Sequence, residues 1–293
     1  MKANFKKLRF LLLLNGYRLY FKLIFTLHPA RGAARAFRLF ATPLNKKVRP
    51  QETEALASAR HFQMEINGKQ IQLYEWGEGT KAALLVHGWE THAGSMGAFA
   101  KMLAEEGYRV LAFDGPAHGK STGQRTNIFE FAEVIACILK QNRDVELLVT
   151  HSFGSGASIF ALAENPGLSP VKIAMITSAD RFKDVFSDFA DVLKMSRKSR
   201  EYLFRYLYQL FGRTVEEMQV SDFAKQTGLK QALLIHDRND RILPFAGSER
   251  IAADWPAARL VPTEGKGHYR ILWSEEVVEE VRALASNRRM QRV

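Results

Sequence analysis

Three short segments, far apart in the sequence, contain the residue types of a nucleophilic catalytic triad. Ser152 lies in residues 150–154, Asp240 in residues 236–240, and His268 in residues 267–269. A serine hydroxyl is a weak nucleophile at neutral pH, so it needs an imidazole nearby to accept its proton. The imidazole in turn needs a carboxylate that sets its tautomer and stabilises its charged form. The order Ser152, Asp240, His268 therefore predicts covalent catalysis by an activated serine.

The elements that would position these residues alternate between strand and helix patterns. Continuously apolar runs, typical of strands buried on both faces, cover residues 81–87, 109–114, 145–151, 171–178, 231–236 and 259–262. Residues 61–66 and 70–76 predict a hairpin around the Asn67-Gly68 pair. Amphipathic helical stretches lie at residues 95–106, 128–141, 154–164, 245–254 and 274–285. This alternation predicts a doubly wound, mostly parallel α/β sheet with right-handed crossovers.

Ser152 stands between an apolar strand and a helix of small residues that begins at Gly154. A tight strand-to-helix turn would hold Ser152 in a strained backbone conformation and expose its hydroxyl at the edge of the sheet. A serine at this position is also a good helix N-cap. The presence of Asp240 and His268 at the ends of later strands favours the nucleophile over the cap.

These segments resemble those of the α/β-hydrolase-fold family, and the resemblance covers about residues 65–287. Ser152 matches the nucleophile of the family's Gly-x-Ser-x-Gly elbow, with Thr150 in place of the first glycine. Residues 86–89, Val-His-Gly-Trp, resemble the family's oxyanion loop. The resemblance implies an oxyanion hole made by the backbone N–H groups of Trp89 and Phe153. Residues 113–121 resemble the family's Asp-x-Pro-Gly-His-Gly-x-Ser turn, to which we assign a structural role.

The resemblance also implies the acid and the base of the triad. Asp240 and its trailing Ile-Leu-Pro match the family's acid, and His268 stands before the final helix, where the base belongs. Asp237 is the alternative acid, although its place at the end of a strand suits a structural role better. No metal is predicted, because the other histidines lack metal-ligand spacing, and no cofactor is expected.

The implied activity is hydrolysis of a small-molecule carboxylic ester through an acyl-enzyme. A serine nucleophile argues against the halide- and epoxide-processing members of the family, which use aspartate. Capped aminopeptidases and C–C bond hydrolases share the same triad, and a non-catalytic homologue that binds a ligand is the third alternative. Residues 181–227 interrupt the strand pattern with helical spacing, which resembles the family's cap and favours an apolar acyl or aryl group.

Charge divides the chain into an extension and a body. The net charge is +11, and residues 1–60 hold 13 Lys and Arg against two Asp and Glu, so the remainder is neutral. This distribution argues against nucleic acid as a partner of the body. The one cysteine excludes an internal disulfide. We therefore predict an extension at residues 1–60, a core at residues 61–180 and 228–293, and a cap at residues 181–227.

The apolar stretch at residues 8–27 is interrupted by Arg9, Arg18 and Lys22, which argues against a membrane-spanning helix or a signal peptide. Its polar residues fall on one stripe of a helix, as in helices that lie in the membrane interface. The pattern predicts peripheral attachment of residues 1–50 to an anionic membrane, a cytoplasmic location at its inner face, and a lipid-like ester substrate. A helix packed on its own chain or on a partner is the alternative.

Overall fold

The computed structural model describes residues 2–44, 47–168 and 170–286. It divides the chain into two compact units, each of which is described by itself. Unit 1 contains residues 1–42 and 181–219, and unit 2 contains residues 43–180 and 220–293.

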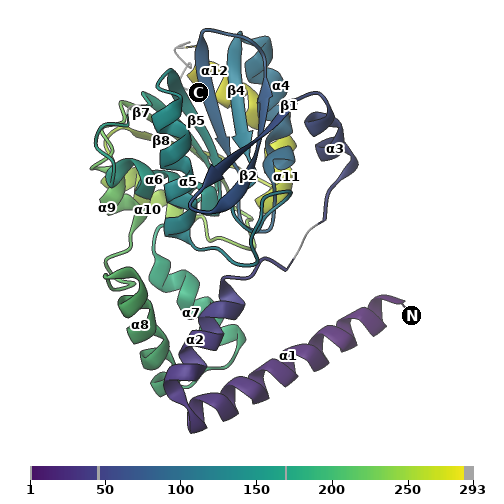
Figure 1. The fold of residues 1–293 in the computed structure, drawn as a ribbon, viewed down its shortest axis with the longest axis vertical. Helices are drawn as coiled ribbons and strands as arrows, with labels where there is room; N and C mark the ends of the chain where they lie inside the picture. Colours follow the sequence, from purple (N-terminus) through teal and green to yellow (C-terminus); the bar gives the residue numbers. More distant parts are fainter. Residues whose placement is uncertain (1, 45–46, 169, 287–293) are drawn as a thin grey trace. The chain divides into compact units, whose positions relative to one another are not determined.

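Unit 2 is built on an eight-stranded sheet with the order β1-β2-β4-β3-β5-β6-β7-β8 (Figure 1). The hairpin of β1 and β2 is antiparallel, β2 is antiparallel to β4, and the remaining neighbours are parallel. The strands are β1 (Arg60–Ile66), β2 (Lys69–Trp76), β3 (Lys81–Val86), β4 (Tyr108–Phe113), β5 (Val145–His151), β6 (Lys172–Ile176), β7 (Gln231–Asp237) and β8 (Ala258–Thr263). The predicted fold class is confirmed, because the six apolar runs predicted as buried strands form β3 to β8 of this sheet.

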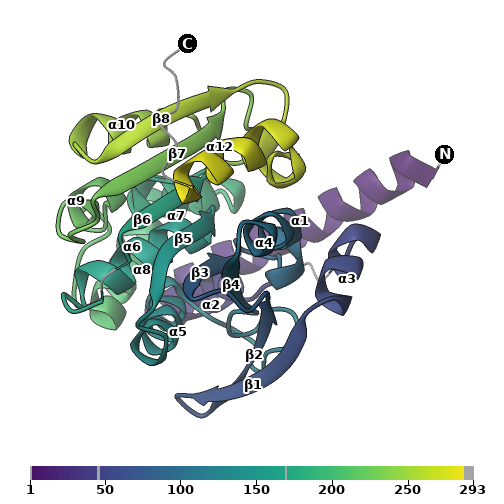
Figure 2. The ribbon, with the colours of Figure 1, turned by 90° about the horizontal axis from the view of Figure 1, so that it is seen from above.

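Helices cover both faces of the sheet of unit 2, as Figure 2 shows. One face carries α4 (Gly97–Glu105) and α12 (Glu275–Ala285), whose apolar side chains join the buried cluster over β3 to β7. The other face carries α5 (Ile128–Gln141), α6 (Phe153–Ala163) and α10 (Ala246–Asp254). The shorter elements of unit 2 are α3 (Pro50–Ala57), η1 (Ala93–Met96), α9 (Val220–Ala224), α11 (Gly267–Arg270) and η2 (Ile271–Trp273). The two covered faces explain why the parallel strands are apolar throughout.

Unit 1 is helical and contains α1 (Lys2–Leu27), α2 (Pro29–Phe40), α7 (Phe182–Val192) and α8 (Arg197–Phe211). Aromatic side chains of α2 join it to the two later helices. The ring of Phe37 lies 5.7 Å from that of Phe211, and the ring of Phe40 lies 4.6 Å from that of Phe186. None of the helices in the described part of the chain has the length and apolarity needed to cross a bilayer.

The structure therefore draws the boundaries differently from the sequence-based domains. Residues 1–42 are not a separate extension but join residues 181–219, because α2 contributes aromatic side chains to the packing of α8. Residues 43–60, with α3, belong to unit 2, and so do residues 220–227, with α9.

The charge asymmetry follows these units. Residues 1–42 and 181–219 together hold 17 Lys and Arg against six Asp and Glu, whereas the rest of the chain holds 25 of each. The net charge of +11 is therefore the charge of unit 1, and unit 2 is neutral.

Candidate active site

The structure brings Ser152, His268 and Asp240 into one hydrogen-bonded line. Ser152 Oγ lies 3.0 Å from His268 Nε2, and His268 Nδ1 lies 2.7 Å from Asp240 Oδ2. Ser152 follows β5, Asp240 follows β7, and His268 lies in the short helix α11 after β8. Because these parallel strands end at the same edge of the sheet, residues far apart in sequence meet there.

Ser152 adopts the strained turn expected of a nucleophile elbow. Its φ is 52° and its ψ is −117°, a region that a non-glycine residue occupies at a cost of about 1–3 kcal/mol. The Ser152 N–H donates hydrogen bonds to the carbonyl oxygens of Ile176 and Thr177, each at 3.0 Å. These bonds to the end of β6 hold the turn between β5 and α6 in place.

Thr150, which replaces a glycine of the family's elbow, fits beneath the turn without displacing it. Its side chain is fully buried, and its Oγ1 donates to the carbonyl oxygen of Ala174 at 3.1 Å. The same oxygen lies 3.0 Å from Ser155 Oγ. The extra hydroxyl is therefore satisfied and ties β5 to β6 and to the first turn of α6.

Two glycines allow backbone to approach the elbow. A Cβ atom at Gly154 would lie 2.4 Å from the His87 carbonyl oxygen, and one at Gly88 would lie 3.1 Å from Ser152 Cβ. The loop after β3 therefore runs directly beside the nucleophile, with Trp89 next in sequence and its ring 5.2 Å from that of Phe153. Phe153 is the first residue of α6, where N–H groups have no acceptor within the helix.

Two histidines hold this loop. The Nδ1 of His87 lies 2.7 Å from the Gly88 carbonyl oxygen, and its Nε2 accepts from the Gly115 N–H at 2.8 Å. Burial, followed by the neighbouring His118, holds the pKa of His87 well below its usual range. His118 Nε2 accepts from the Glu90 N–H at 3.1 Å, beside a left-handed φ of 56° at Glu90. His87 thus joins the loop after β3 to Gly115.

Asp240 is held as a carboxylate although its side chain has no exposed surface. Its Oδ1 accepts from the N–H groups of Ile242 at 2.7 Å and Leu243 at 3.1 Å. Burial opposes ionisation, yet hydrogen bonds from His236 and His268 keep the pKa of Asp240 far below its usual range. The charge needed to orient and stabilise a protonated His268 is therefore present in the folded protein.

Asp237, the alternative acid, lies elsewhere. Its Oδ2 accepts from the Lys266 N–H at 2.7 Å and from Thr263 Oγ1 at 3.1 Å, and its Oδ1 accepts from the Asn239 N–H at 2.9 Å. Asp237 thus fastens β7 to the segment that leads to His268. The imidazole of His268 lies against the other carboxylate, so of the two acids the structure places Asp240 against the base.

Two histidines beside the triad were not singled out from the sequence. His151 Nε2 donates to the His268 carbonyl oxygen at 3.0 Å. Burial, and then the charge of His268, lowers the pKa of His151 to about 3, so its ring stays neutral. His236 Nε2 lies 3.5 Å from Asp240 Oδ2. In the sequence only their positions set these histidines apart. His151 immediately precedes Ser152, and His236 stands four residues before Asp240.

A sequence profile described as the alpha/beta hydrolase fold matches residues 82–231, which is just over half of the chain. The chain belongs to the α/β-hydrolase fold family. A human monoglyceride lipase is 30% identical over 122 residues, which are 36% of this chain and 40% of the lipase. A 2-hydroxy-6-oxononadienedioate/2-hydroxy-6-oxononatrienedioate hydrolase of Escherichia coli K12 is 25% identical over 264 residues, covering 74% of this chain and 91% of that enzyme.

Solved structures of the same fold include a bacterial membrane phospholipase A, with a TM-score of 0.63 and 19% identity over 98% of this chain and 99% of that one. A Pyrococcus furiosus esterase has a TM-score of 0.63 and 18% identity over 84% of this chain and 98% of its own. At these identities the structures support the fold alone. The sequence family and its named relatives support a hydrolase.

The family's turn at residues 113–121 has a structural role here. Asp114 Oδ2 accepts from the Tyr74 hydroxyl at 2.9 Å and from the Lys120 N–H at 2.8 Å, while its Oδ1 accepts from the Ala93 N–H at 2.9 Å. Ser121 Oγ donates back to the Asp114 carbonyl oxygen at 2.5 Å. The carboxylate is fully occupied in joining β2, β4 and η1.

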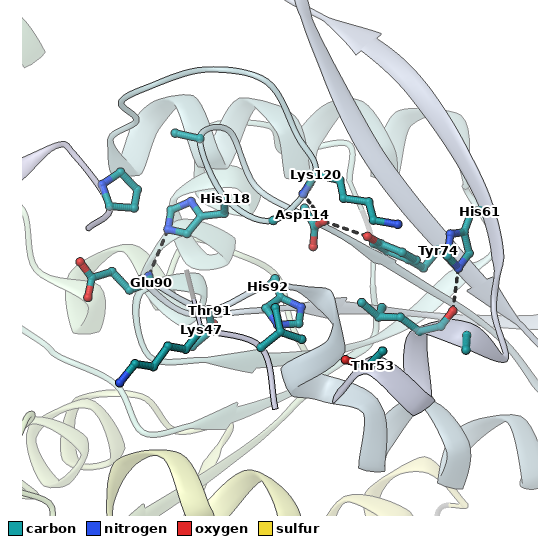
Figure 3. Close-up of a pocket in the computed structure, with 16 residues that line it drawn as sticks. Lys47, Thr53, His61, Tyr74, Glu90, Thr91, His92, Asp114, His118 and Lys120 are labelled. Carbon is teal, nitrogen blue, oxygen red and sulfur yellow. Dashed lines mark hydrogen bonds between the residues drawn. The ribbon is translucent and has the colours of Figure 1, made fainter. Parts of the chain in front are cut away.

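Unit 2 contains a cavity of about 390 Å³ (Figure 3). Its lining includes Tyr74 of β2 and the residues that follow Trp89. Glu90, Thr91 and His92 form one wall of it, and its lining includes none of the three triad residues. It is therefore separate from the catalytic line. Among the described residues, no group of three or more His, Cys, Asp or Glu side chains has the arrangement of a metal site.

Proposed function

We propose that this α/β-hydrolase-fold protein is a serine hydrolase that cleaves carboxylic esters. The observation that carries the proposal is the line of hydrogen bonds from Ser152 through His268 to Asp240, at 3.0 and 2.7 Å. The strained backbone of Ser152 also supports the proposal, because residues in such conformations cluster at active sites.

In the proposed reaction, Ser152 Oγ attacks the ester carbonyl while His268 Nε2 takes the hydroxyl proton. The negative charge that forms on the carbonyl oxygen is received by the N–H groups of Trp89 and Phe153, and each such donor contributes about 10²–10³ in turnover. His268 then gives the proton to the departing alkoxide, which leaves as an alcohol. Water, deprotonated by His268, cleaves the acyl-enzyme and releases the acid.

The substrate class that we favour is a lipid-like ester with an apolar acyl or aryl group. A relative named as a monoglyceride lipase supports this choice. The same triad also suits amide or C–C bond cleavage. A panel of nitrophenyl esters of increasing acyl length, run beside aminoacyl anilides, would distinguish ester from amide cleavage. The role of residues 181–227 as a cap stays a prediction.

Reaction with a fluorophosphonate probe tests whether the triad is active. The probe phosphonylates only a serine that a neighbouring base deprotonates, so we expect labelling of the native protein at Ser152, read by mass spectrometry of the modified peptide. The variant His268→Gln is expected to lose labelling while Ser152 remains present. An inert Ser152 in the folded native protein would instead support the non-catalytic, ligand-binding alternative.

We propose further that α1 attaches unit 1 to a membrane surface. Leu12, Leu19, Leu23 and Leu27 are 64%, 59%, 54% and 70% exposed and share one side of the helix, whereas Phe21, on the opposite side, is buried. A continuous apolar stripe left uncovered on a basic unit is the arrangement of an interfacial helix. This attachment would place a lipid-like substrate near the enzyme.

Two serine substitutions in the stripe test the attachment. We expect Leu19→Ser with Leu23→Ser to weaken binding of the full-length protein to phosphatidylcholine vesicles, with or without anionic lipid, by about ten-fold or more, since both leucines would leave the membrane. Co-sedimentation measures this binding. The matched control is Val192→Ser with Leu210→Ser, which changes exposed apolar residues of α7 and α8. Equal binding by all three proteins would contradict the attachment. Deleting residues 1–50 is a poorer test, because it removes α2 from the packing of unit 1.

A further inference from the structure

Unit 1 contains a groove of about 640 Å³ between α1 and the segment that joins α7 to α8. Its floor includes four buried apolar side chains, Phe21, Phe25, Leu193 and Met195. Its polar lining includes four cations and no carboxylate: Arg18, Lys22, Lys194 and Lys198. An apolar floor under a cationic rim matches the division of a phospholipid into glycerol-acyl and phosphate parts.

Three positive charges of the groove have no counter-charge among the residues that the structure describes. Lys22, Lys194 and Lys198 have no carboxylate at ion-pair distance in the described part of the chain, and all three are exposed. The acids nearest in sequence to Lys194 and Lys198 are Asp191 and Glu201, which pair with Arg200 at 2.5 Å and with Arg197 at 3.2 Å. Arg18 Nε donates to the Val192 carbonyl oxygen at 2.9 Å, which fixes its guanidinium at the groove. A cluster of this kind attracts an anion.

Lys194 stands where a glycine would be less strained. It follows the C-cap residue of α7, Leu193, and has a φ of 53°. Its N–H donates to the Asp191 carbonyl oxygen, and the Met195 N–H donates to that of Ala190. This is the Schellman arrangement, in which the left-handed residue is usually glycine. The strained backbone thus carries a cation at the groove, where glycine would relieve the strain but remove the charge.

We propose that the groove binds the phosphate headgroup of an anionic phospholipid. Arg18 and Lys22 lie one turn apart on α1, on the flank between the exposed leucine stripe and buried Phe21 and Phe25. When the stripe lies in a membrane, this flank is at the level of the headgroups. The inference rests on the proposed attachment of α1 and does not depend on the catalytic triad.

The test measures co-sedimentation with phosphatidylcholine vesicles that do or do not contain phosphatidylglycerol, in the Ser152→Ala background so that no lipid is consumed. Lys22→Gln with Lys198→Gln is expected to weaken binding to the phosphatidylglycerol vesicles by about ten-fold or more, because each lysine at an anionic surface is worth roughly five-fold. Binding to vesicles of phosphatidylcholine alone should change less than about two-fold. The matched control, Arg31→Gln with Arg38→Gln, removes two exposed charges of α2 outside the groove and should cost less than about three-fold.

Lys194→Gly separates a binding role from a structural one. Glycine relieves the left-handed strain, so the melting temperature should stay equal or rise, while binding to phosphatidylglycerol vesicles falls about five-fold. If the lysine pair of the groove and the arginine pair of α2 lose vesicle binding equally when replaced, the attraction is diffuse. That result would overturn the proposed headgroup site. Abolition of binding by millimolar inorganic phosphate would show a free-anion site and overturn the lipid assignment.

These outcomes are independent of catalysis. On an otherwise native background, the groove variants should hydrolyse a soluble nitrophenyl ester at the native rate. A protein that binds phosphatidylglycerol vesicles through the groove but has no esterase activity would contradict the proposed hydrolase alone. Normal esterase activity with unchanged vesicle binding in the groove variants would contradict the headgroup site alone.

Discussion

Replacing Ser152 with alanine is expected to lower kcat for a soluble nitrophenyl ester by about five to six orders of magnitude. The substitution removes the oxygen that lies 3.0 Å from His268 Nε2, so no acyl-enzyme can form. Losses of this size follow removal of the nucleophile from a serine triad, and what remains comes from the oxyanion donors and from substrate binding. Initial rates and the acyl-enzyme burst measure the loss. The melting temperature should hold or rise, because alanine removes no buried hydrogen bond other than the one to His268.

Ser158→Ala is the matched control for this experiment. Ser158 is buried in α6, the helix that follows the nucleophile, and its Oγ donates to the Gly154 carbonyl oxygen at 2.8 Å. The same loss of one hydroxyl there should leave kcat within about ten-fold, since the helix backbone keeps its own hydrogen bonds. Substantial turnover by Ser152→Ala would mean that another group attacks the substrate, and the proposed mechanism would be wrong.

Asp240→Asn is expected to lower kcat by about four orders of magnitude with little change in KM. Asparagine has the shape of aspartate, but its amide can donate to His268 Nδ1 and so stabilise the tautomer that cannot accept the serine proton. It also lacks the charge that stabilises protonated His268. Because the pKa of Asp240 is far below its usual range, the carboxylate stays ionised throughout the pH range of the assay. The lower limb of the native pH–rate profile should therefore not arise from titration of Asp240.

Asp237→Asn is the matched control, and it should affect stability more than catalysis. Asp237 is fully buried, and its carboxylate accepts a hydrogen bond from the Lys266 N–H at 2.7 Å. The substitution therefore weakens the hydrogen bonds that hold the segment before His268 against β7. We expect a lower melting temperature and a kcat within about ten-fold of the native value. The opposite ranking, with Asp237→Asn as the less active variant, would contradict the choice of Asp240 as the acid.

Most of the sheet could be read from the sequence because its signals are local. A strand buried on both faces must be apolar along its length, so a short apolar run bounded by turn residues marks such a strand. The positions of Ser152, Asp240 and His268 at the ends of such runs follow for the same reason. Thr150 shows the limit of this reading. Its fit depends on an acceptor in β6, the Ala174 carbonyl oxygen, which only the neighbouring strand supplies.

The surroundings of the triad could not be read from the sequence because they depend on contacts between distant strands. Nothing local distinguishes His151, which holds the His268 carbonyl oxygen, from an ordinary buried histidine. The N-terminal extension is predicted from its charge, and charge is local information. Its packing is not, since the ring that meets Phe37 belongs to Phe211, more than 170 residues later.

Residue type and periodicity predicted the fold class and the concentration of positive charge, while the order of serine, aspartate and histidine, together with the resemblance to a known family, implied the three candidate catalytic residues. Only the tertiary structure decided that Asp240 rather than Asp237 meets His268, that the helices of residues 1–42 and 181–219 form one basic unit, and that four cations line one groove in it. The physical reason is that hydrogen-bond partners and shared grooves are set by the order and twist of the strands and by how helices pack. Residues close in sequence, such as Asp237 and Asp240, can thus point to different partners.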